Sequence, residues 1–535
     1  MAPALKANDV LTIFFIRSPA DVPLALSAPP DRLRSVGVAA AGPRFTHQIF
    51  PNEAIVGYAP GLAIRLLYTA GSMVSYLTVT GAADAVEEAA DADGVPDGTP
   101  RRGGTDADEA IAPVARPRGV GGGGGGARGA KRIDASRPPN DGGGGDGEKT
   151  DILGLLAPHV APSAVTSVEA LTAAAAAPWS PPLPPSCVVA EYTLPPRPAA
   201  SGATAVADSD GSGSDDTSGG GAASADHGGV YRVYKCRLND HPDAVAYHKR
   251  IQAHAMLHID GANYIDDADP RWEVFFTWWF PDGTATDGND GGGGGRPGVE
   301  LVAYATIYPF AVYEKAPPVA PTRGRVGRTS GVRGRRGGGG DADGGGGGGV
   351  GRFRDRLRIS QVLVVPPHQR AGHGGHLLAA IYADAAARDA TEVTVEDPSA
   401  GFRRLRDGTD LRRGVAAGLL PPPEGLSYDA VPEVVERLQR SLRVTARQAR
   451  RVVEIHLLRG VAGGGGVGAE GAGVAEGEAG VGGAGRAWRL FVKRRLWVDW
   501  EEVLGPAAEG PARKAKLAEI YADVLDEYRE VLGRR

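Results

Sequence analysis

A strand that runs through a short glycine turn into an amphipathic helix is the feature that most constrains the fold of this chain. Residues 358–365 are rich in β-branched side chains, and two prolines follow that cannot continue a sheet ladder, which predicts where the strand ends. Apolar residues then recur at helical spacing over 377–385, which predicts a helix packed on a sheet by one face. This strand–turn–helix unit favours an α/β fold.

The turn between these two elements is suited to bind a phosphate. The first turn of a helix has N–H donors without partners and the positive end of the helix dipole, and glycines without a Cβ let an anion approach closely. Gly372 and Gly374 stand at this junction. An ordinary glycine-rich turn without a ligand is the alternative, because the chain has 80 glycines among 535 residues.

A second short strand downstream ends in acidic residues. Residues 391–395 alternate as a strand, Glu396 and Asp397 follow, and Pro398 predicts a stop. Two neighbouring strands would then present a phosphate-binding turn and a carboxylate at one edge of a sheet. This arrangement resembles a Gcn5-related N-acetyltransferase fold.

Motifs around these two strand ends are shared with one family. The string Q-V-L-V at 361–364 is followed by Gln369-x-x-Gly372-His373-Gly374, and V-E-D-P-S at 395–399 is followed by L-R-D at 405–407. Further matching segments lie at 45–50, 247–252, 265–267, 271–272, 448–452 and 492–496. The chain resembles the catalytic subunit of the type B histone acetyltransferase over nearly its whole length, apart from glycine-rich segments.

Those glycine-rich segments divide the chain. They lie at 81–150, 196–229, 283–299, 316–351 and 462–486, and we expect them to be flexible, since they bury too little apolar surface to offset chain entropy. The rest, roughly 350 residues, suffices for two or three small domains. We predict a strand-rich domain at 1–80, a central domain with the first part of the acetyltransferase sheet at 151–315, an acetyl-CoA-binding and catalytic core at 352–425, and a helical domain at 426–535.

The fold class that we expect is α/β (α+β), with a mixed sheet flanked by helices. Apolar or alternating runs predict strands near 13–16, 62–68, 187–192, 231–235, 274–280 and 301–308, and a helix over 242–260. From Pro432 onward the pattern is helical. An apolar stripe ends the chain and indicates either self-packing or a partner surface; it comprises Leu517, Ile520, Tyr521, Val524, Leu525, Tyr528 and Val531.

The composition, together with the lack of a leader pattern and of a membrane-spanning run, predicts a location in the nucleus and cytoplasm. Two cysteines, Cys187 and Cys236, are too few for a disulfide framework or a zinc site. The first residues do not form a leader pattern, and no run approaches membrane-spanning length. A net charge of -5 argues against a positive electrostatic field over the whole protein that would attract nucleic acid. Direct DNA binding is not required for the expected activity. The arginine-rich run at 323–336 fits RNA contact, nuclear import or a solvated loop, and we assign it no role.

Acetyl transfer to a lysine requires a base, because an amine with a pKa of roughly 10.4 is mostly protonated at neutral pH. A carboxylate at a strand end suits this task, and the resemblance implies that Glu396 is the general base. A strand-end cap or salt bridge is the alternative role. Asp260 and Asp397 also match acidic positions of the family; they share the base role or are merely solvated.

The resemblance implies acetyl-CoA as cosubstrate, with no metal. The thioester carbonyl needs a backbone N–H near Leu363 or Val364, and the pyrophosphate needs the N–H groups of the glycine turn. The candidate cofactor contacts are Val362, Leu363, Val364, Gln369, Arg370, Ala371, Gly372, His373, Gly374, Gly375 and Ser399.

A lysine-rich tail should be drawn to carboxylates and aromatic walls. The candidate substrate contacts are Glu53, Asp266, Asp267, Trp272, Tyr308, Pro309 and Phe310. Pro309 interrupts an aromatic run and the segment at 51–53 is less acidic than in the family, so tail affinity and site preference stay open. Trp278 and Trp279 fit the core better than a substrate wall. Tyr304, Tyr308 and Tyr313 fit either a general acid or an ordinary sheet face.

The function implied is acetylation of lysines on free, newly made histones, chiefly the tail of histone four. The family also implies a WD-repeat histone-binding propeller as partner. Two alternatives stay open: a same-fold acetyltransferase for protein N-termini or small amines, and a histone-binding escort that has lost catalysis.

Overall fold

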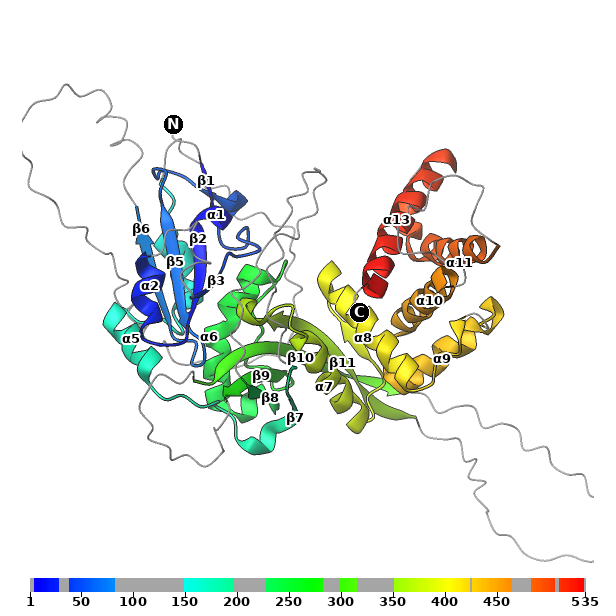
Figure 1. Cartoon of the computed structure of the whole chain (residues 1–535), viewed down its shortest axis with the longest axis horizontal. Helices are drawn as coiled ribbons and strands as arrows, with labels where there is room; N and C mark the ends of the chain where they lie inside the picture. Colours follow the sequence, from blue (N-terminus) through cyan, green and yellow to red (C-terminus); the bar gives the residue numbers. More distant parts are fainter. Residues whose placement is uncertain are drawn as a thin grey trace, which may run out of the picture. The chain divides into compact units, whose positions relative to one another are not determined.

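The computed structural model describes residues 4–27, 38–81, 149–195, 228–281, 298–314, 351–423, 426–463, 483–505 and 510–533 (Figure 1). The glycine-rich segments named above lie almost entirely outside these residues, as does the arginine-rich run at 323–336. The chain divides into two compact units. Unit 1 comprises Met1–Ile307 and Ser360–Ile381, and unit 2 comprises Tyr308–Ile359 and Tyr382–Arg535.

A four-stranded sheet begins unit 1. Its order is β3-β2-β5-β6, with β2 parallel to β5 and the other pairs antiparallel. Because side chains alternate across a strand, Phe14 and Leu67 face a cluster with helices α2 and α5, while Phe15 and Tyr68 face the larger core. The elements are β2 (Leu11–Ile16), α2 (Asp21–Ser27), β3 (Ala39–Ala41), β5 (Ala63–Thr69), β6 (Ser75–Thr80) and α5 (Val168–Ala176).

Smaller elements flank this sheet. Strands β1 (Leu5–Lys6) and β4 (Ala54–Ile55) form an antiparallel pair. Helices α1 (Ala7–Val10) and α4 (Ile152–Val160) add Ala7, Ile152 and Leu156 to the larger core.

The second sheet has six strands in the order β12-β11-β10-β9-β8-β7. Only the β11–β12 pair is parallel among the pairs whose register is known. The strands are β7 (Val188–Tyr192), β8 (Gly229–Arg237), β9 (Glu273–Pro281), β10 (Glu300–Glu314), β11 (Arg352–Val364) and β12 (Val393–Val395). All six were predicted, and the mixed α/β architecture confirms the predicted fold class.

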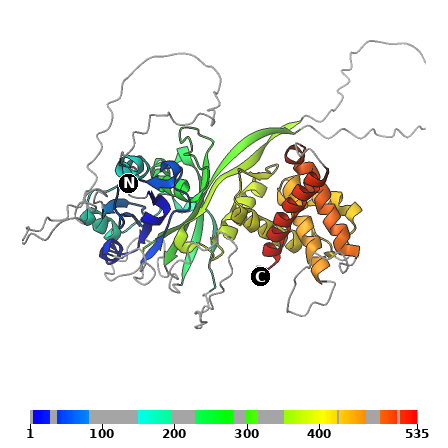
Figure 2. The same cartoon turned by 90° about the horizontal axis from the view of Figure 1, so that it is seen from above.

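Strands β10 and β11 are longer than predicted, and both units contain part of each (Figure 2). Pro309 lies within β10, although a proline cannot donate to a sheet ladder. It is tolerated because the pairing with β9 ends at Ile307. The apolar pattern identified only the buried part, since Tyr313 and Phe353 in the extensions are 52% and 73% exposed.

Helix α6 (Pro242–His258) packs on the strands of unit 1 through aromatic residues. The Trp278 indole N–H donates to the Tyr247 hydroxyl at 3.2 Å, and that hydroxyl donates to the Gly71 carbonyl at 2.7 Å. Trp278 and Trp279 are buried, which confirms the predicted core role. The helix ends two residues earlier than predicted.

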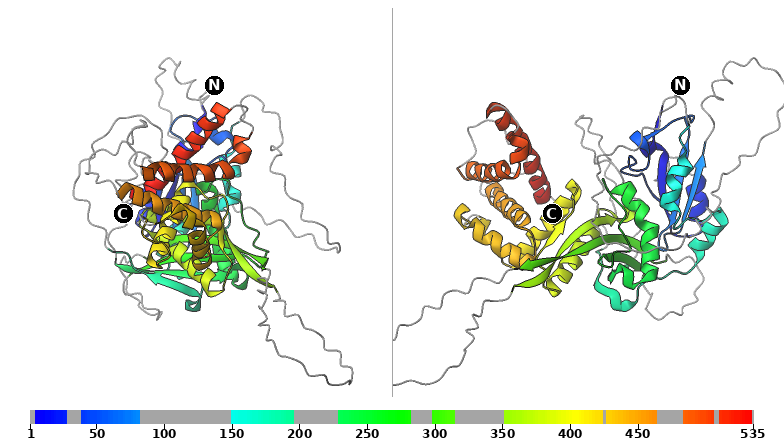
Figure 3. Two further views of the ribbon diagram at one scale, coloured as in Figure 1. Left: turned by 90° about the vertical axis from the view of Figure 1, so that its right-hand side faces the viewer. Right: turned by 180° about the vertical axis from the view of Figure 1, so that it is seen from behind.

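Unit 2 contains the C-terminal helices (Figure 3). Arg495 forms a paired contact with Glu454 at 2.8 and 3.0 Å, and Tyr528 donates to the same carboxylate at 2.7 Å. Three residues of the C-terminal stripe, Ile520, Tyr528 and Val531, are buried and pack within the unit, whereas its other four residues are half-buried. The helices are α8 (Ala400–Ala416), α9 (Val431–Leu442), α10 (Ala446–Gly463), α11 (Gly483–Asp499), α12 (Glu501–Leu504) and α13 (Gly510–Gly533).

Two further properties bear on the sequence-based expectations. Cys187 and Cys236 are both free. Across the described residues, no helix combines the length and the apolar character needed to cross a membrane.

Candidate active site

The glycine turn lies where it was predicted, between β11 and helix α7 (His373–Ala387). A single 3-10 turn, η5 (Pro366–His368), follows the strand. The Gln369 side chain then donates to the Val364 carbonyl at 2.9 Å, which closes the turn on the strand end. Arg370 and Gly372 have positive φ angles of 65° and 97°. The backbone therefore reverses through two left-handed residues before the helix begins.

The turn has the properties that an anion requires. A Cβ placed on Gly372 or Gly375 would meet no atom within 4 Å, so the space above the turn is open. Among the described residues, no hydrogen bond occupies the backbone N–H groups of Ala371 and Gly372. Together with the first N–H groups of α7, these donors fit a pyrophosphate. The predicted cofactor role of the turn is therefore compatible with its geometry.

Substitution of Gly372 should weaken the turn selectively. We expect Gly372→Ala to reduce coenzyme A affinity about tenfold, because a left-handed residue with a Cβ costs on the order of 1–2 kcal/mol. Gly408→Ala is the control, since Gly408 lies inside α8 and its Cβ would make only ordinary contacts. Calorimetric titration with coenzyme A checks this prediction, and equal affinity of both variants would contradict it.

The remaining predicted cofactor residues have identifiable structural roles. Leu363 is buried, whereas Val362 and Val364 are half-buried on the alternate face of β11. The Ser399 hydroxyl accepts a hydrogen bond from the Phe402 N–H at 3.2 Å, so it caps α8. Its predicted contact with the cofactor stays a prediction.

Glu396 lies directly after β12, as predicted, in unit 2. The parallel pairing of β11 and β12 runs from Leu357 to Ile359, and the Glu396 N–H then donates to the Ile359 carbonyl at 2.9 Å. The Glu396 side chain is 43% exposed, and one carboxylate oxygen lies 3.4 Å from Arg358 Nε. The carboxylate is thus paired with a cation yet remains accessible from solvent.

Arg358 connects Glu396 to two predicted substrate residues. Its guanidinium lies over the Phe310 ring at 4.8 Å, and the rings of Phe310 and Tyr308 are 4.8 Å apart. Pro309, which separates these two residues in the sequence, is half-buried. Arg358 was missed by the sequence analysis. Arg358 lies opposite Thr394 in the parallel pair, two residues before Glu396. Its closeness to Glu396 can therefore be recognised only once the register of β11 and β12 is known.

Asp397 follows Glu396 in an exposed turn with a φ of 35°. This places Asp397 beside the carboxylate that the resemblance assigns as base, without an ion pair of its own among the described residues.

Unit 1 brings together two other predicted residues, Glu53 and Asp260, around His47. Its ring nitrogens lie 3.6 Å from Glu53 and 3.3 Å from Asp260. The neighbouring Gln48 side chain donates to the carbonyls of Met256 and Ile259, which fixes this loop to the end of α6. All three side chains of the cluster are at least 39% exposed. His47 was quoted in a family motif but was given no role.

The other predicted substrate residues of unit 1 are engaged in local contacts. Asp267 pairs with Lys249 at 2.7 Å, and Asp266 accepts from the Ala268 N–H at 3.1 Å. Trp272 is half-buried against the larger core. These contacts position the three side chains, and their role toward a substrate stays a prediction.

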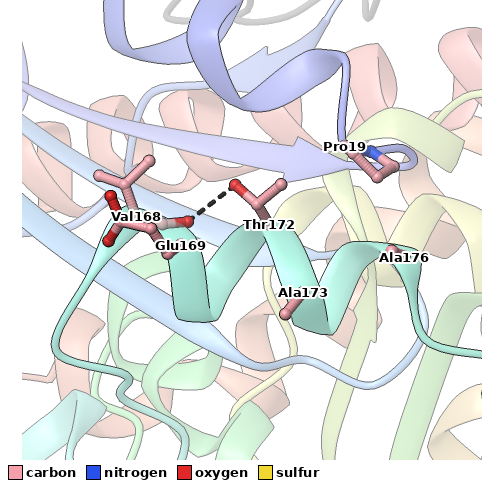
Figure 4. A pocket seen from close by; sticks show the side chains of 6 residues that line it. All are labelled: Pro19, Val168, Glu169, Thr172, Ala173 and Ala176. Atoms are coloured by element: carbon pink, nitrogen blue, oxygen red, sulfur yellow. Dashed lines mark hydrogen bonds between the residues drawn. The ribbon is translucent and has the colours of Figure 1, made fainter.

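An open depression of about 500 Å³ lies elsewhere in unit 1 (Figure 4). Its lining comes from α5 and from Pro19, and Thr172 donates to the Val168 carbonyl within the helix. Glu169 is its one ionisable lining residue, and no predicted site residue contributes to it. The depression therefore has no connection with the predicted chemistry.

Comparisons with known proteins agree with the motifs. Residues 4–95 match the family model described as Histone acetyl transferase HAT1 N-terminus. Three curated proteins named Histone acetyltransferase type B catalytic subunit are similar to the chain. The protein of Mycosarcoma maydis is 26% identical over 58% of this chain, that of Cryptococcus neoformans 26% over 57%, and that of Pyricularia oryzae 29% over 53%.

The matched region spans 56%, 59% and 60% of the length of these relatives, respectively. It thus covers less than two thirds of each. The family model and the relatives confirm the resemblance that the motifs indicated: this chain is similar to the catalytic subunits of type B histone acetyltransferases.

Proposed function

We propose that this protein is an acetyl-CoA-dependent histone lysine N-acetyltransferase. The observation that carries the proposal is that β11 leads into an open anion-binding turn, while β12, which pairs in parallel with Leu357–Ile359 of β11, leads into an exposed Glu396. The similarity to type B catalytic subunits supports the same activity.

Glu396 is the proposed general base. Its carboxylate takes a proton from the substrate ammonium, directly or through a water, so that the neutral amine can attack. Arg358 holds the carboxylate from one side. Asp397 and Asp260 are proposed as further acidic groups that share or assist this role.

The turn at 369–375 is proposed to hold the pyrophosphate through backbone N–H groups, so the side chains of Arg370 and Ala371 matter little for it. When bound, acetyl-CoA supplies the acetyl group as an activated thioester. A backbone N–H of Leu363 or Val364 donates to the thioester oxygen as its negative charge grows in the transition state.

The proposed substrate is the lysine-rich tail of histone four on free, newly made histones. Acidic and aromatic side chains would attract such a tail. In unit 1 these are Glu53, Asp260, Asp266, Asp267 and Trp272, and in unit 2 they are Tyr308 and Phe310. We further propose a WD-repeat histone-binding propeller as partner and a location in nucleus and cytoplasm.

The test measures turnover of acetyl-CoA with a histone-four tail peptide and with a scrambled peptide of equal charge. We expect turnover with the tail peptide only. Turnover with both peptides would indicate a general amine acetyltransferase, and tail binding without turnover would indicate a histone escort. Either of these two results would overturn the proposal.

A further inference from the structure

A buried carboxylate lies next to the glycine turn and has no part in the chemistry proposed above. Glu300 begins β10 and is 4% exposed. Its carboxylate lies 2.8 Å from Arg17 Nε and accepts from Arg17 Nη2 at 3.1 Å. The second oxygen also lies 3.3 Å from His368 Nε2. All three residues belong to unit 1.

The carboxylate is held in its charged form. Burial alone would raise the pKa of Glu300, but the hydrogen bond from His368 and the Arg17 guanidinium lower it below the usual value. A buried ion pair of this kind seldom adds much net stability relative to apolar packing. Its geometric effect on the groups that it contacts is therefore the more informative property.

His368 is the last residue before the turn that begins at Gln369. Arg370 in this turn has a Cβ and yet adopts a left-handed conformation, and an unfavourable backbone conformation of this kind persists only where its surroundings hold it. Glu300 fixes the ring of His368, which is 7% exposed. The start of the turn is thus anchored to the core.

The end of the turn is anchored separately. His373 opens α7; its Nδ1 lies 2.9 Å from the Tyr192 hydroxyl, and its ring packs on Tyr231 at 4.6 Å. The rings of His368 and His373 meet edge to face, with centroids 5.8 Å apart. The two imidazoles thus contact each other at the two ends of the turn, and the Glu300 carboxylate contacts that of His368.

We propose that Glu300 is a positioning residue that acts through His368 to hold the turn at 369–375 in its anion-binding conformation. This inference rests on the proposed function, because it concerns affinity for the cofactor. Arg17, which follows β2, completes the anchor and links the four-stranded sheet to the cofactor turn.

The test compares coenzyme A affinity in three full-length variants by calorimetric titration. Glu300→Gln keeps the shape but replaces a charge-assisted hydrogen bond by a weaker neutral one. We expect about tenfold weaker coenzyme A binding and a raised KM for acetyl-CoA, with kcat at saturation little changed. Glu273→Gln is the matched control, since Glu273 is a buried carboxylate that begins the adjacent strand and pairs with Lys235 at 3.3 Å.

The third variant, Arg17→Met with Glu300→Met, removes both charges and leaves no buried ion unpaired, so it decides the question if the single variant fails to fold. We expect its affinity to be low as well, because methionine in place of Glu300 leaves His368 Nε2 without this acceptor. Wild-type affinity in Glu300→Gln or in the double variant, or an equal loss in Glu273→Gln, would overturn the inference. Failure of the wild type to bind coenzyme A would instead overturn the proposed function, and the inference with it.

Discussion

Replacement of Glu396 by Gln should lower kcat for acetyl transfer by about a hundredfold or more, since a positioned general base contributes roughly 10²–10⁴ in rate. Glutamine has the size of glutamate but cannot take up the proton of the lysine ammonium. The loss should appear in kcat, while coenzyme A affinity stays near the wild-type value, because the substitution leaves untouched the turn that we propose to bind the pyrophosphate. Steady-state kinetics with a histone-four tail peptide, together with calorimetric titration, measures both quantities.

Glu392→Gln is a control that the fold itself provides. Glu392 and Glu396 flank the same short strand, and each pairs with an arginine of β11: Arg356 at 2.9 Å and Arg358 at 3.4 Å. If Glu396 served only as a strand-end salt bridge, the two variants would behave alike. Ion pairs at the protein surface contribute about 0–1 kcal/mol, so Glu392→Gln should keep turnover within about threefold. Equal kcat values for the two variants would refute the base assignment.

The parts of the fold that were predictable depend on local patterns. The strand over 358–365 and the helix beyond it follow from β-branched and three-and-four periodicities, and the two prolines mark the strand end correctly. Helix α6 was predicted within two residues, because its apolar face and its proline start are both local signals. In each case the information lies within one element.

The parts that were not predictable depend on contacts between distant residues. Arg358 approaches Glu396 only because β11 and β12 pair in one parallel register, which periodicity does not specify. His47 lies between Glu53 and Asp260 because Gln48 ties its loop to the end of α6. The extensions of β10 and β11 bury little apolar surface, so they lack the pattern by which strands are recognised. The carboxylates were therefore identifiable from the sequence, and their partners were not.

Acidification should destabilise unit 1 through three buried histidines of α6. Burial lowers the pKa of His248 and His258 to about 4, and burial with the nearby His258 lowers that of His254 to about 3. Asp267 near His248 acts in the opposite direction, and Arg44 near His258 in the same direction. In the unfolded chain these side chains titrate near a pKa of 6.5.

The sign follows from proton linkage. Below pH 6.5 the unfolded chain binds protons that the folded chain excludes, so stability is present above that pH and is lost as pH falls toward the folded pKa values of 3 to 4. Between pH 7 and 5 the loss amounts to about 2 kcal/mol for each histidine. For the three together it approaches the whole stability of an ordinary domain, which is about 5–15 kcal/mol.

His254→Phe tests this account most directly. Neither ring nitrogen of His254 has a hydrogen-bond partner among the described residues, and the ring packs against Phe15 and Tyr68. A phenyl ring keeps that packing and removes two unsatisfied polar atoms, so stability at pH 7 should stay level or rise. Below pH 6.5 the variant should lose stability less steeply, by about one third, as one of the three protons no longer opposes folding.

Hydrogen exchange of peptides from α6, followed by mass spectrometry and corrected for the intrinsic pH dependence of exchange, measures the opening free energy of this region. His241→Asn is the control, because it removes the half-buried imidazole that precedes the same helix and leaves the three buried ones in place. The control should show the wild-type slope between pH 7 and 5. A wild-type slope in His254→Phe as well would mean that His254 binds protons equally in the folded and the unfolded chain, and that its burial does not destabilise unit 1 in acid.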